Sequence, residues 1–231
     1  VNGQNVIEGN TGIYSEVQTK GNTFSTLQLL NSPKIKSSKN LVEVSDIIYG
    51  DNNVAIHENW KFIVSDSNIK LSITRTFPKA FEAESVSFPA IEFNNINTWE
   101  GAFQGFGGIA WFYLFNEKLM TYGVHTNEAS FWNSTDNNGL HILVNAPGKQ
   151  VAMKYSRADD DKLDYSIAVS PVEMLPRYDS GTHRRRFIRN KTDVWAPFQV
   201  MAGTSTETIS LSAFNFAKEF NRGEFKGGNG K

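Results

Sequence analysis

The stretch Ile69-Lys70-Leu71-Ser72-Ile73-Thr74-Arg75-Thr76-Phe77 decides the fold class of this 231-residue chain. Its odd positions are apolar, except for Arg75, and its even positions are polar. This alternation predicts a β-strand with one core face and one solvent face. Segment 56–64 alternates in the same way, interrupted only at Glu58, and the turn residues 65–68 join the two. We therefore predict a hairpin whose core face holds Trp60, Phe62, Leu71, Ile73 and Phe77.

The same period extends along most of the chain. Segment 139–171 reads as a β-meander with turns at 146–148 and 158–161. About a dozen strands exceed what one open sheet usually holds, so we predict an all-β fold, a large two-sheet antiparallel sandwich. One short helix is expected at 215–222, where apolar residues recur at helical spacing. The other expected strands are 12–20, 23–30, 41–49, 83–94, 108–115, 119–126, 128–134, 194–202 and 206–214.

Composition narrows the class of protein. The chain has 23 basic and 24 acidic residues and a net charge of −1, which argues against nucleic-acid binding. It has no cysteine, and its four histidines lack metal-ligand spacing, so we expect no metal and no cofactor. The acidic cluster Asp159-Asp160-Asp161 is either a solvated turn or a calcium site, and the turn is favoured.

The ends of the chain suggest how it is organised. We predict one β-sandwich domain over residues 1–226, followed at 227–231 by a flexible tail or the start of an interdomain linker. No stretch reaches the roughly 20 apolar residues that a membrane span needs. The chain opens on Val1 rather than on Met. Either a signal peptide was removed, which implies a periplasmic or secreted protein, or the chain begins inside a longer one.

Motifs for catalysis are missing from the sequence. It has no nucleophile elbow, no phosphate-binding loop and no dinucleotide fingerprint. The acidic residues Glu92, Glu100, Glu117 and Glu128 cannot be paired by sequence for glycoside hydrolysis. The basic run 183–191 suits an anionic sugar, an acidic neighbouring domain or a solvated edge strand.

Aromatic residues in polar settings are the most suggestive feature. Trp99, Trp132 and Trp195 each stand among Asn, Asp, Ser or Thr residues. A sugar presents a flat apolar face and a rim of hydroxyl groups, which suits such an environment. The alternative is that these rings anchor the core, because tryptophan buries a large area. We predict them as candidate carbohydrate-binding residues, whereas Trp60 and Trp111 stand mid-strand and are expected in the core.

The chain resembles the supersandwich domain of the galactose mutarotase-like group. The residues that carry the resemblance are the hairpin from Glu58 to Phe77, the apolar strand at 108–115 and the strand around 207–211 before a glycine-rich exit. Such domains precede the helical catalytic barrel of bacterial glycoside hydrolases. The mutarotases of the group use a His and a Glu, and no local motif here matches either.

The resemblance implies a non-catalytic domain of a carbohydrate-active enzyme that supports or shapes a glycan site. Its expected partners are a carbohydrate and a helical catalytic domain C-terminal to this chain. Two alternatives stay open at this point. One is a stand-alone carbohydrate-binding domain, and the other is an enzyme of the mutarotase or epimerase kind.

Overall fold

The computed structural model describes residues 11–93, 101–104, 109–111, 121–124, 127–133, 138–146, 150–157, 163–170 and 198–213. These ranges form strands joined by turns and short connections, and they contain no helix long and apolar enough to cross a bilayer. The strands are β1 (Ile13–Thr19), β2 (Asn22–Ser25), β3 (Lys34–Ser38), β4 (Leu41–Gly50), β5 (Ala55–Val64), β6 (Asn68–Phe77), β7 (Phe81–Ala83), β8 (Ser85–Phe93), β9 (Gly101–Gln104), β10 (Ile109–Trp111), β11 (Thr121–Val124), β12 (Glu128–Asn133), β13 (Asn138–Asn145), β14 (Gln150–Arg157), β15 (Leu163–Ser170), β16 (Phe198–Val200) and β17 (Gly203–Ala213).

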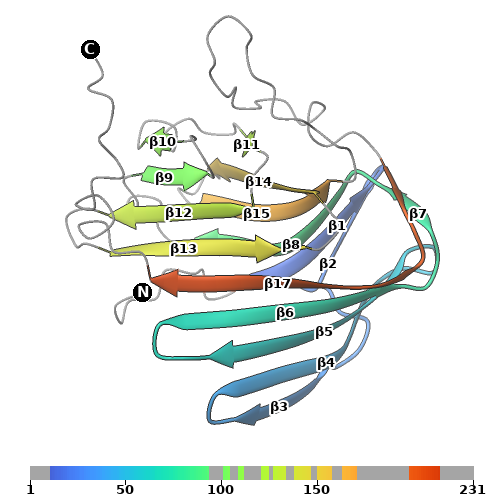
Figure 1. Cartoon of the computed structure of the whole chain (residues 1–231). Coiled ribbons are helices and arrows are strands. Elements are labelled where there is room, and N and C mark those ends of the chain that lie inside the picture. Colours follow the sequence, from blue (N-terminus) through green and yellow to red (C-terminus); the bar gives the residue numbers. More distant parts are fainter. Residues whose placement is uncertain are drawn as a thin grey trace, which may run out of the picture.

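Two large antiparallel sheets form the sandwich. The nine-stranded sheet has the order β10-β9-β12-β13-β17-β6-β5-β4-β3, and the six-stranded sheet has the order β11-β14-β15-β8-β1-β2. In Figure 1 the nine-stranded sheet lies in front of the six-stranded one. A third, two-stranded sheet pairs β16 with β7. The predicted all-β, two-sheet sandwich is confirmed.

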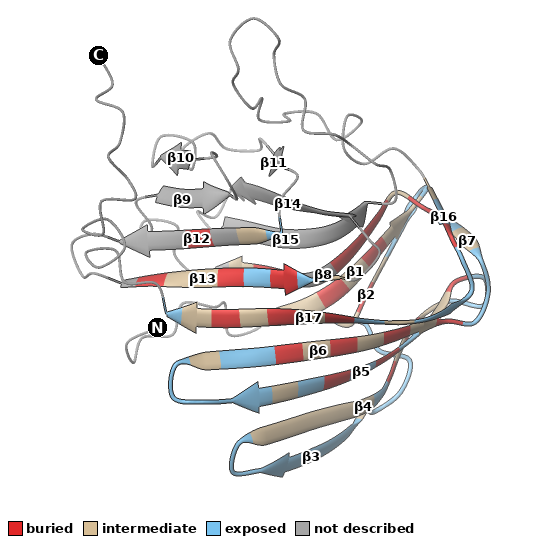
Figure 2. Cartoon of the chain, in the orientation of Figure 1, coloured by how far each residue is buried: buried red, intermediate tan, exposed pale blue. Residues whose placement is uncertain are grey.

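The core fills the space between the two sheets. Ile56, Leu71, Ile73 and Ile209 are fully buried on the inner face of the nine-stranded sheet, and Val17 is fully buried on β1 opposite. Figure 2 shows buried positions recurring along β5, β6, β17 and β13. Alternate residues of a strand share a face, so this pattern follows directly from the alternation in the sequence.

The predicted hairpin is confirmed as β5 and β6. Trp60, Leu71, Ile73 and Phe77 are buried as expected, while Phe62 is only partly buried and packs against the core from its margin. The backbone of Ser65 donates to the Asn68 carbonyl at 2.8 Å and closes the turn. The hairpin is paired through eight residue pairs, from His57–Thr76 to Val64–Ile69.

Some boundaries differ from the sequence-based expectation. The strand predicted at 23–30 ends at Ser25, because the Ser25 hydroxyl and carbonyl accept from the amides of Leu27 and Gln28 and turn the chain. The segment predicted at 83–94 is divided between β7 and β8. Strand β3 was not predicted, since all its side chains are exposed and no apolar face marks it. The expected helix at 215–222 and the tail at 227–231 lie outside the described residues.

Candidate functional site

A groove of about 360 Å³ lies across strands β3 to β6 of the nine-stranded sheet. Its polar lining comes from alternate residues that face away from the core, and Val44 and Trp60 also line it. The sheet thus offers hydroxyl, amide, ammonium and carboxylate groups along one concavity. The polar lining residues are Lys36, Glu43, Ser45, Asn59, Lys61, Ser72 and Thr74.

A β-bulge in β4 shapes this part of the sheet. The register between β4 and β5 shifts between Val44 and Ile47, and Asp46 within the bulge has a φ of 60°. Three contacts hold it: the Asp46 amide donates to Asn59 Oδ1 at 3.1 Å, Asn31 Nδ2 donates to the Asp46 carbonyl at 2.8 Å, and Lys34 pairs with the Asp46 carboxylate at 2.7 Å. Bulges bend a strand and re-aim its side chains, and this one lies directly beside the groove residues Val44 and Ser45.

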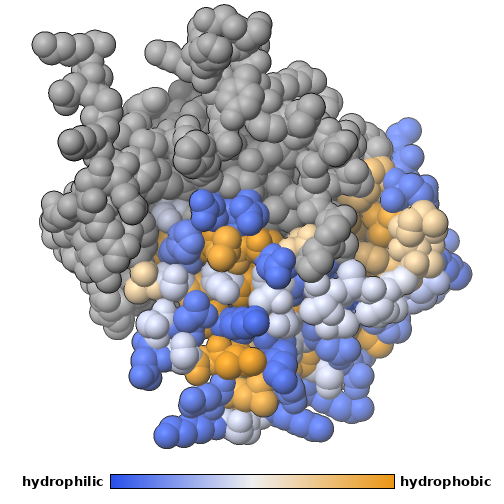
Figure 3. Space-filling view, viewed as in Figure 1, coloured by the Kyte–Doolittle hydropathy of each residue, from blue (hydrophilic) through white to orange (hydrophobic). Residues whose placement is uncertain are grey.

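A ladder of threonine hydroxyls borders the groove on β6 and β17. The hydroxyls of Thr74 and Thr206 lie 2.9 Å apart, and those of Thr76 and Thr204 lie 2.8 Å apart. All four belong to directly opposed positions of the two strands. Each hydroxyl is both donor and acceptor, so the ladder keeps hydrogen-bonding capacity toward solvent. Figure 3 shows the described part of this face, where hydrophilic residues surround smaller hydrophobic patches.

The charged side chains of the groove, on β3, β4 and β5, are only partly neutralised. Lys61 Nζ lies 3.3 Å from Glu43 Oε1 across β5 and β4, and both side chains are about half exposed. Lys36 stands next to Glu43 in the register of β3 and β4. Among the described residues, Lys36 has no carboxylate within 4.0 Å. The groove therefore carries a surplus of positive charge.

A charged network lies on the opposite, buried face of the same strands. Glu58 and Arg75 are each 1% exposed and form an ion pair between Arg75 Nε and Glu58 Oε1. Glu58 Oε1 also accepts from the Tyr49 hydroxyl at 2.8 Å, and Glu58 Oε2 accepts from Trp60 Nε1 at 2.6 Å. Arg75 Nη2 donates to the Ser15 hydroxyl at 3.1 Å, which ties the nine-stranded sheet to β1 of the other sheet. The network thus spans the core.

Burial and neighbouring charges in this network shift the pKa values of Tyr49 and Arg75. Burial, followed by the negative charge of Glu58, raises the pKa of Tyr49 well above its usual range. Burial acts to lower the pKa of Arg75, but the carboxylates of Glu58 and Glu207, together with the phenol of Tyr49 once it ionises at high pH, outweigh burial and raise that pKa. At neutral pH, Tyr49 is therefore a neutral donor and Arg75 a cation. These are properties of a structural network enclosed in the core.

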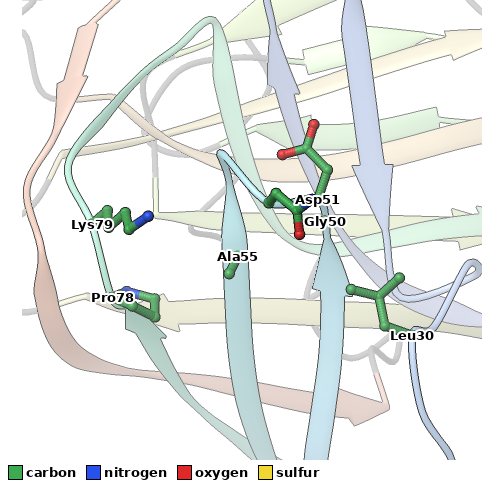
Figure 4. A pocket seen from close by; sticks show the side chains of 7 residues that line it. Leu30, Gly50, Asp51, Ala55, Pro78 and Lys79 are labelled. Carbon is green, nitrogen blue, oxygen red and sulfur yellow. The ribbon is translucent and has the colours of Figure 1, made fainter.

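A second concavity, of about 490 Å³, lies at the end of the sheet where β4 turns into β5. Figure 4 shows Asp51 and Lys79 on either side of Ala55 in its lining. Gly50 has a φ of 110°, and a Cβ there would meet the Val54 carbonyl oxygen at 1.8 Å. Asp51 Oδ1 accepts from the amides of Asn53 and Val54 at 2.8 and 2.7 Å. The turn itself thus uses one of the few polar groups of this concavity. The groove on the sheet face, with seven polar side chains in its lining, offers more polar atoms to a ligand.

A third feature lies on β12 and β13. The Ser130 hydroxyl and His141 Nδ1 are 2.6 Å apart, and Ser130 is 5% exposed. Glu128 lies two residues before Ser130 on β12, so it shares their face of the sheet. The described residues contain no group of three or more His, Asp or Glu that could hold a metal ion.

Most of the residues singled out from the sequence lie outside the part described. Trp99 and Trp195 are among them, as are Asp159-Asp160-Asp161 and the basic run 183–191. The backbone of Trp132 belongs to β12 and pairs with Gly139 and Gly101, but its side chain is outside the description. The roles of these three tryptophans therefore stay predictions.

The groove residues were missed by sequence reasoning, although a signal for them existed. The even positions of the stretch 69–77, including Ser72 and Thr74, were recognised as a solvent face. Nothing in the sequence indicated that 34–38 adds a further strand beside them, or that a bulge at Asp46 bends the sheet. Both depend on pairing between segments that the local pattern does not mark.

Comparisons with known proteins give a fold and no family. No protein-family model matches the sequence, and no curated protein is significantly similar to it. Among solved structures, the galactosidase domain of the α-galactosidase–sucrose kinase AgaSK aligns with a TM-score of 0.50 and 10% identity, over 88% of this chain and 30% of that one. The Slr1438 protein from Synechocystis sp. PCC 6803 aligns with a TM-score of 0.50 and 7% identity, over 79% of this chain and 66% of that one.

A protein described as an aldose 1-epimerase from Escherichia coli K12 aligns over 91% of this chain and 80% of its own, with a TM-score of 0.47 and 10% identity. The chain spans about 30% of the α-galactosidase chains that it matches. At these identities the likeness shows the fold alone. That fold is the supersandwich, as the resemblance in the sequence implied.

Proposed function

We propose that this chain is a non-catalytic β-sandwich domain of a carbohydrate-active enzyme, and that the groove on its nine-stranded sheet contributes to a glycan site. The observation that carries the proposal is the lining of that groove, which offers seven polar side chains over about 360 Å³. Sugars are recognised by several hydrogen-bonding groups at once, and alternate residues of adjacent strands supply them here on a rigid surface. The shared fold with the galactosidase domain of AgaSK supports the same class.

The proposal includes partners and a location. The chain would work beside a helical catalytic domain C-terminal to it, in the periplasm or outside the cell. The chain spans about 30% of the α-galactosidase chains that it matches, and this supports a role as one part of a larger enzyme. Trp99, Trp132 and Trp195 remain proposed as further sugar contacts.

Calorimetry with a panel of oligosaccharides tests the glycan site on the full 231-residue chain. The double variant Ser72→Ala/Thr74→Val removes two hydroxyls from the groove and leaves the core face intact. We expect it to weaken binding at least fivefold, with an unchanged thermal transition. Thr23→Val, at an exposed position on β2 of the other sheet, is the matched control and should bind as the wild type does. Equal affinity of the double variant and the wild type would place the site elsewhere.

A second function is favoured by one observation on β12 and β13. Interconversion of sugar anomers needs a base that takes the proton of the C1 hydroxyl and an acid that protonates the ring oxygen as the C1–O5 bond breaks, and ring closure reverses both transfers. His141 shares a sheet face with Glu128 and Ser130. Polarimetry on freshly dissolved α-D-galactose decides between the two functions. A rate above that of buffer, lost in His141→Gln, would establish the enzyme and remove the non-catalytic proposal.

A further inference from the structure

One row of polar side chains runs across six strands of the nine-stranded sheet. Each member is paired directly with the next, so the row is continuous from the β3 edge to β13. Neighbouring strands lie about 4.8 Å apart, which makes the row roughly 24 Å long. The members, in order, are Lys36, Glu43, Lys61, Ser72, Thr208 and Asn145.

Charge is unevenly distributed along this row. Its β3 to β5 part has cations at both sides of Glu43, and its remaining members are neutral hydrogen-bonding groups. The adjoining positions add Lys34 and Asp46, which pair with each other at 2.7 Å, and Lys70, which stands opposite Ile63. The outward face of β3 to β6 thus holds four lysines, Lys34, Lys36, Lys61 and Lys70, against the two carboxylates of Glu43 and Asp46.

We propose that this row binds an acidic polysaccharide, a chain of sugars bearing carboxylate groups, laid across the strands. The inference rests on the proposed function, and it adds the charge class of the ligand. Lys36 and Lys61 supply the ammonium groups for the acid groups of the chain, while Ser72, Thr208 and Asn145 bind the sugar hydroxyls. The row crosses the strands, so a ligand can bind one side chain from each strand in turn.

The experiment compares a charged ligand with its uncharged ester. Hexagalacturonate and its full methyl ester share one backbone, and calorimetry on the 231-residue chain at low salt measures both. We expect the acid form to bind at least tenfold more tightly, and added salt to remove most of that difference through screening. Alginate and hyaluronan oligomers extend the acidic set, and inorganic polyphosphate serves as a polyanion without sugars.

Variants test which side chains carry the preference. Lys36→Glu should weaken binding of the acid form about fivefold, the size of one exposed ion pair, and leave the ester unaffected. Lys61→Gln should act in the same direction. Lys20→Glu makes the same charge change in the β1–β2 turn of the other sheet, and it should bind as the wild type does. Because β3 is fully exposed, Lys36→Glu leaves the core untouched.

The possible results distinguish a failure of this inference from a failure of the proposed function on which it rests. Equal binding of acid and ester chains overturns the acidic preference and leaves the glycan site in place. Binding of polyphosphate as tight as that of the acidic sugars overturns the sugar as the ligand of this row. Failure of every acidic oligomer to bind, while neutral oligosaccharides bind, removes this inference alone. Failure of all oligosaccharides removes both proposals.

Discussion

On strands β5, β6 and β17, polar side chains occupy both faces of the nine-stranded sheet, and the two faces differ in what surrounds them. The inner face holds Glu58 and Arg75, each 1% exposed and joined in one network with Tyr49 and Trp60. The outer face holds the threonine ladder and the groove, in contact with solvent. Adjacent residues of one strand, Thr74 and Arg75, therefore belong to different environments.

The comparison shows that burial determines how much stability is lost when a polar group loses its partner. A buried charge that loses its partner is left uncompensated in a medium of low dielectric constant, which is costly. An exposed hydroxyl that loses its partner is rehydrated at once, so its removal costs little. The inner network therefore matters for the stability of the fold, whereas the outer groups face solvent, where a ligand can reach them.

The largest expected effect is that of breaking the inner ion pair. Arg75→Ala leaves Glu58 buried without its cation and should lower the free energy of unfolding by about 3–5 kcal/mol. Thr74→Ala, one residue away on the outer face, should lower it by less than about 1 kcal/mol. Urea denaturation of both variants measures the contrast. A loss below about 1 kcal/mol for Arg75→Ala would mean that the two faces do not differ as described.

The next effect concerns Tyr49 and pH. Removing its hydroxyl in Tyr49→Phe deprives Glu58 of one donor and should lower the free energy of unfolding by about 1–2 kcal/mol at neutral pH.

The same residue makes stability depend on pH. The pKa of Tyr49 is raised on folding, so the folded state keeps its phenolic proton above about pH 10, where the unfolded state loses it. This contribution to stability is complete below about pH 10 and declines as the pH rises further. Denaturation curves between pH 8 and 11 should fall more steeply for the wild type than for Tyr49→Phe, and parallel curves would contradict the buried phenol.

A smaller effect is expected from the exposed ion pair of the groove. Lys61→Gln should change the free energy of unfolding by no more than about 0.5 kcal/mol, because both side chains of the Lys61–Glu43 pair are about half exposed. The change should shrink further in 0.5 M salt. Thermal melts at two salt concentrations measure it. A loss as large as that expected for Arg75→Ala would show that the outer face also stabilises the fold.

The smallest effect on stability belongs to the threonine ladder. Thr204→Val at the end of the ladder removes one hydroxyl from the pair with Thr76 and should leave the free energy of unfolding within about 0.5 kcal/mol of the wild type. Valine favours strands as threonine does, so the backbone pairing is kept. A destabilisation above about 1 kcal/mol in the same urea titration would mean that the hydroxyl pair is structural.

The strands of the hairpin were predictable because each carries its own signal. Alternation over 69–77 fixes both the strand and the assignment of its faces, and the two exceptions to the pattern, Glu58 and Arg75, turn out to be each other's partner. Sequence reasoning recorded them as interruptions, since it had no means of placing them opposite one another across β5 and β6. A pair of opposite charges at equivalent positions of a predicted hairpin is a signal that would have found the network.

Local alternation by itself determined the all-β class, the two-sheet sandwich and the core face of β5 and β6, because the period of a strand is a property of its own residues. Only the tertiary structure decided that β3 extends the sheet, that a bulge at Asp46 bends it, and that Lys36, Lys61, Ser72 and Thr208 stand in one row. Those positions are up to 172 residues apart in the chain. Which distant side chains become neighbours is set by strand register, and register is fixed by the packing of the whole core.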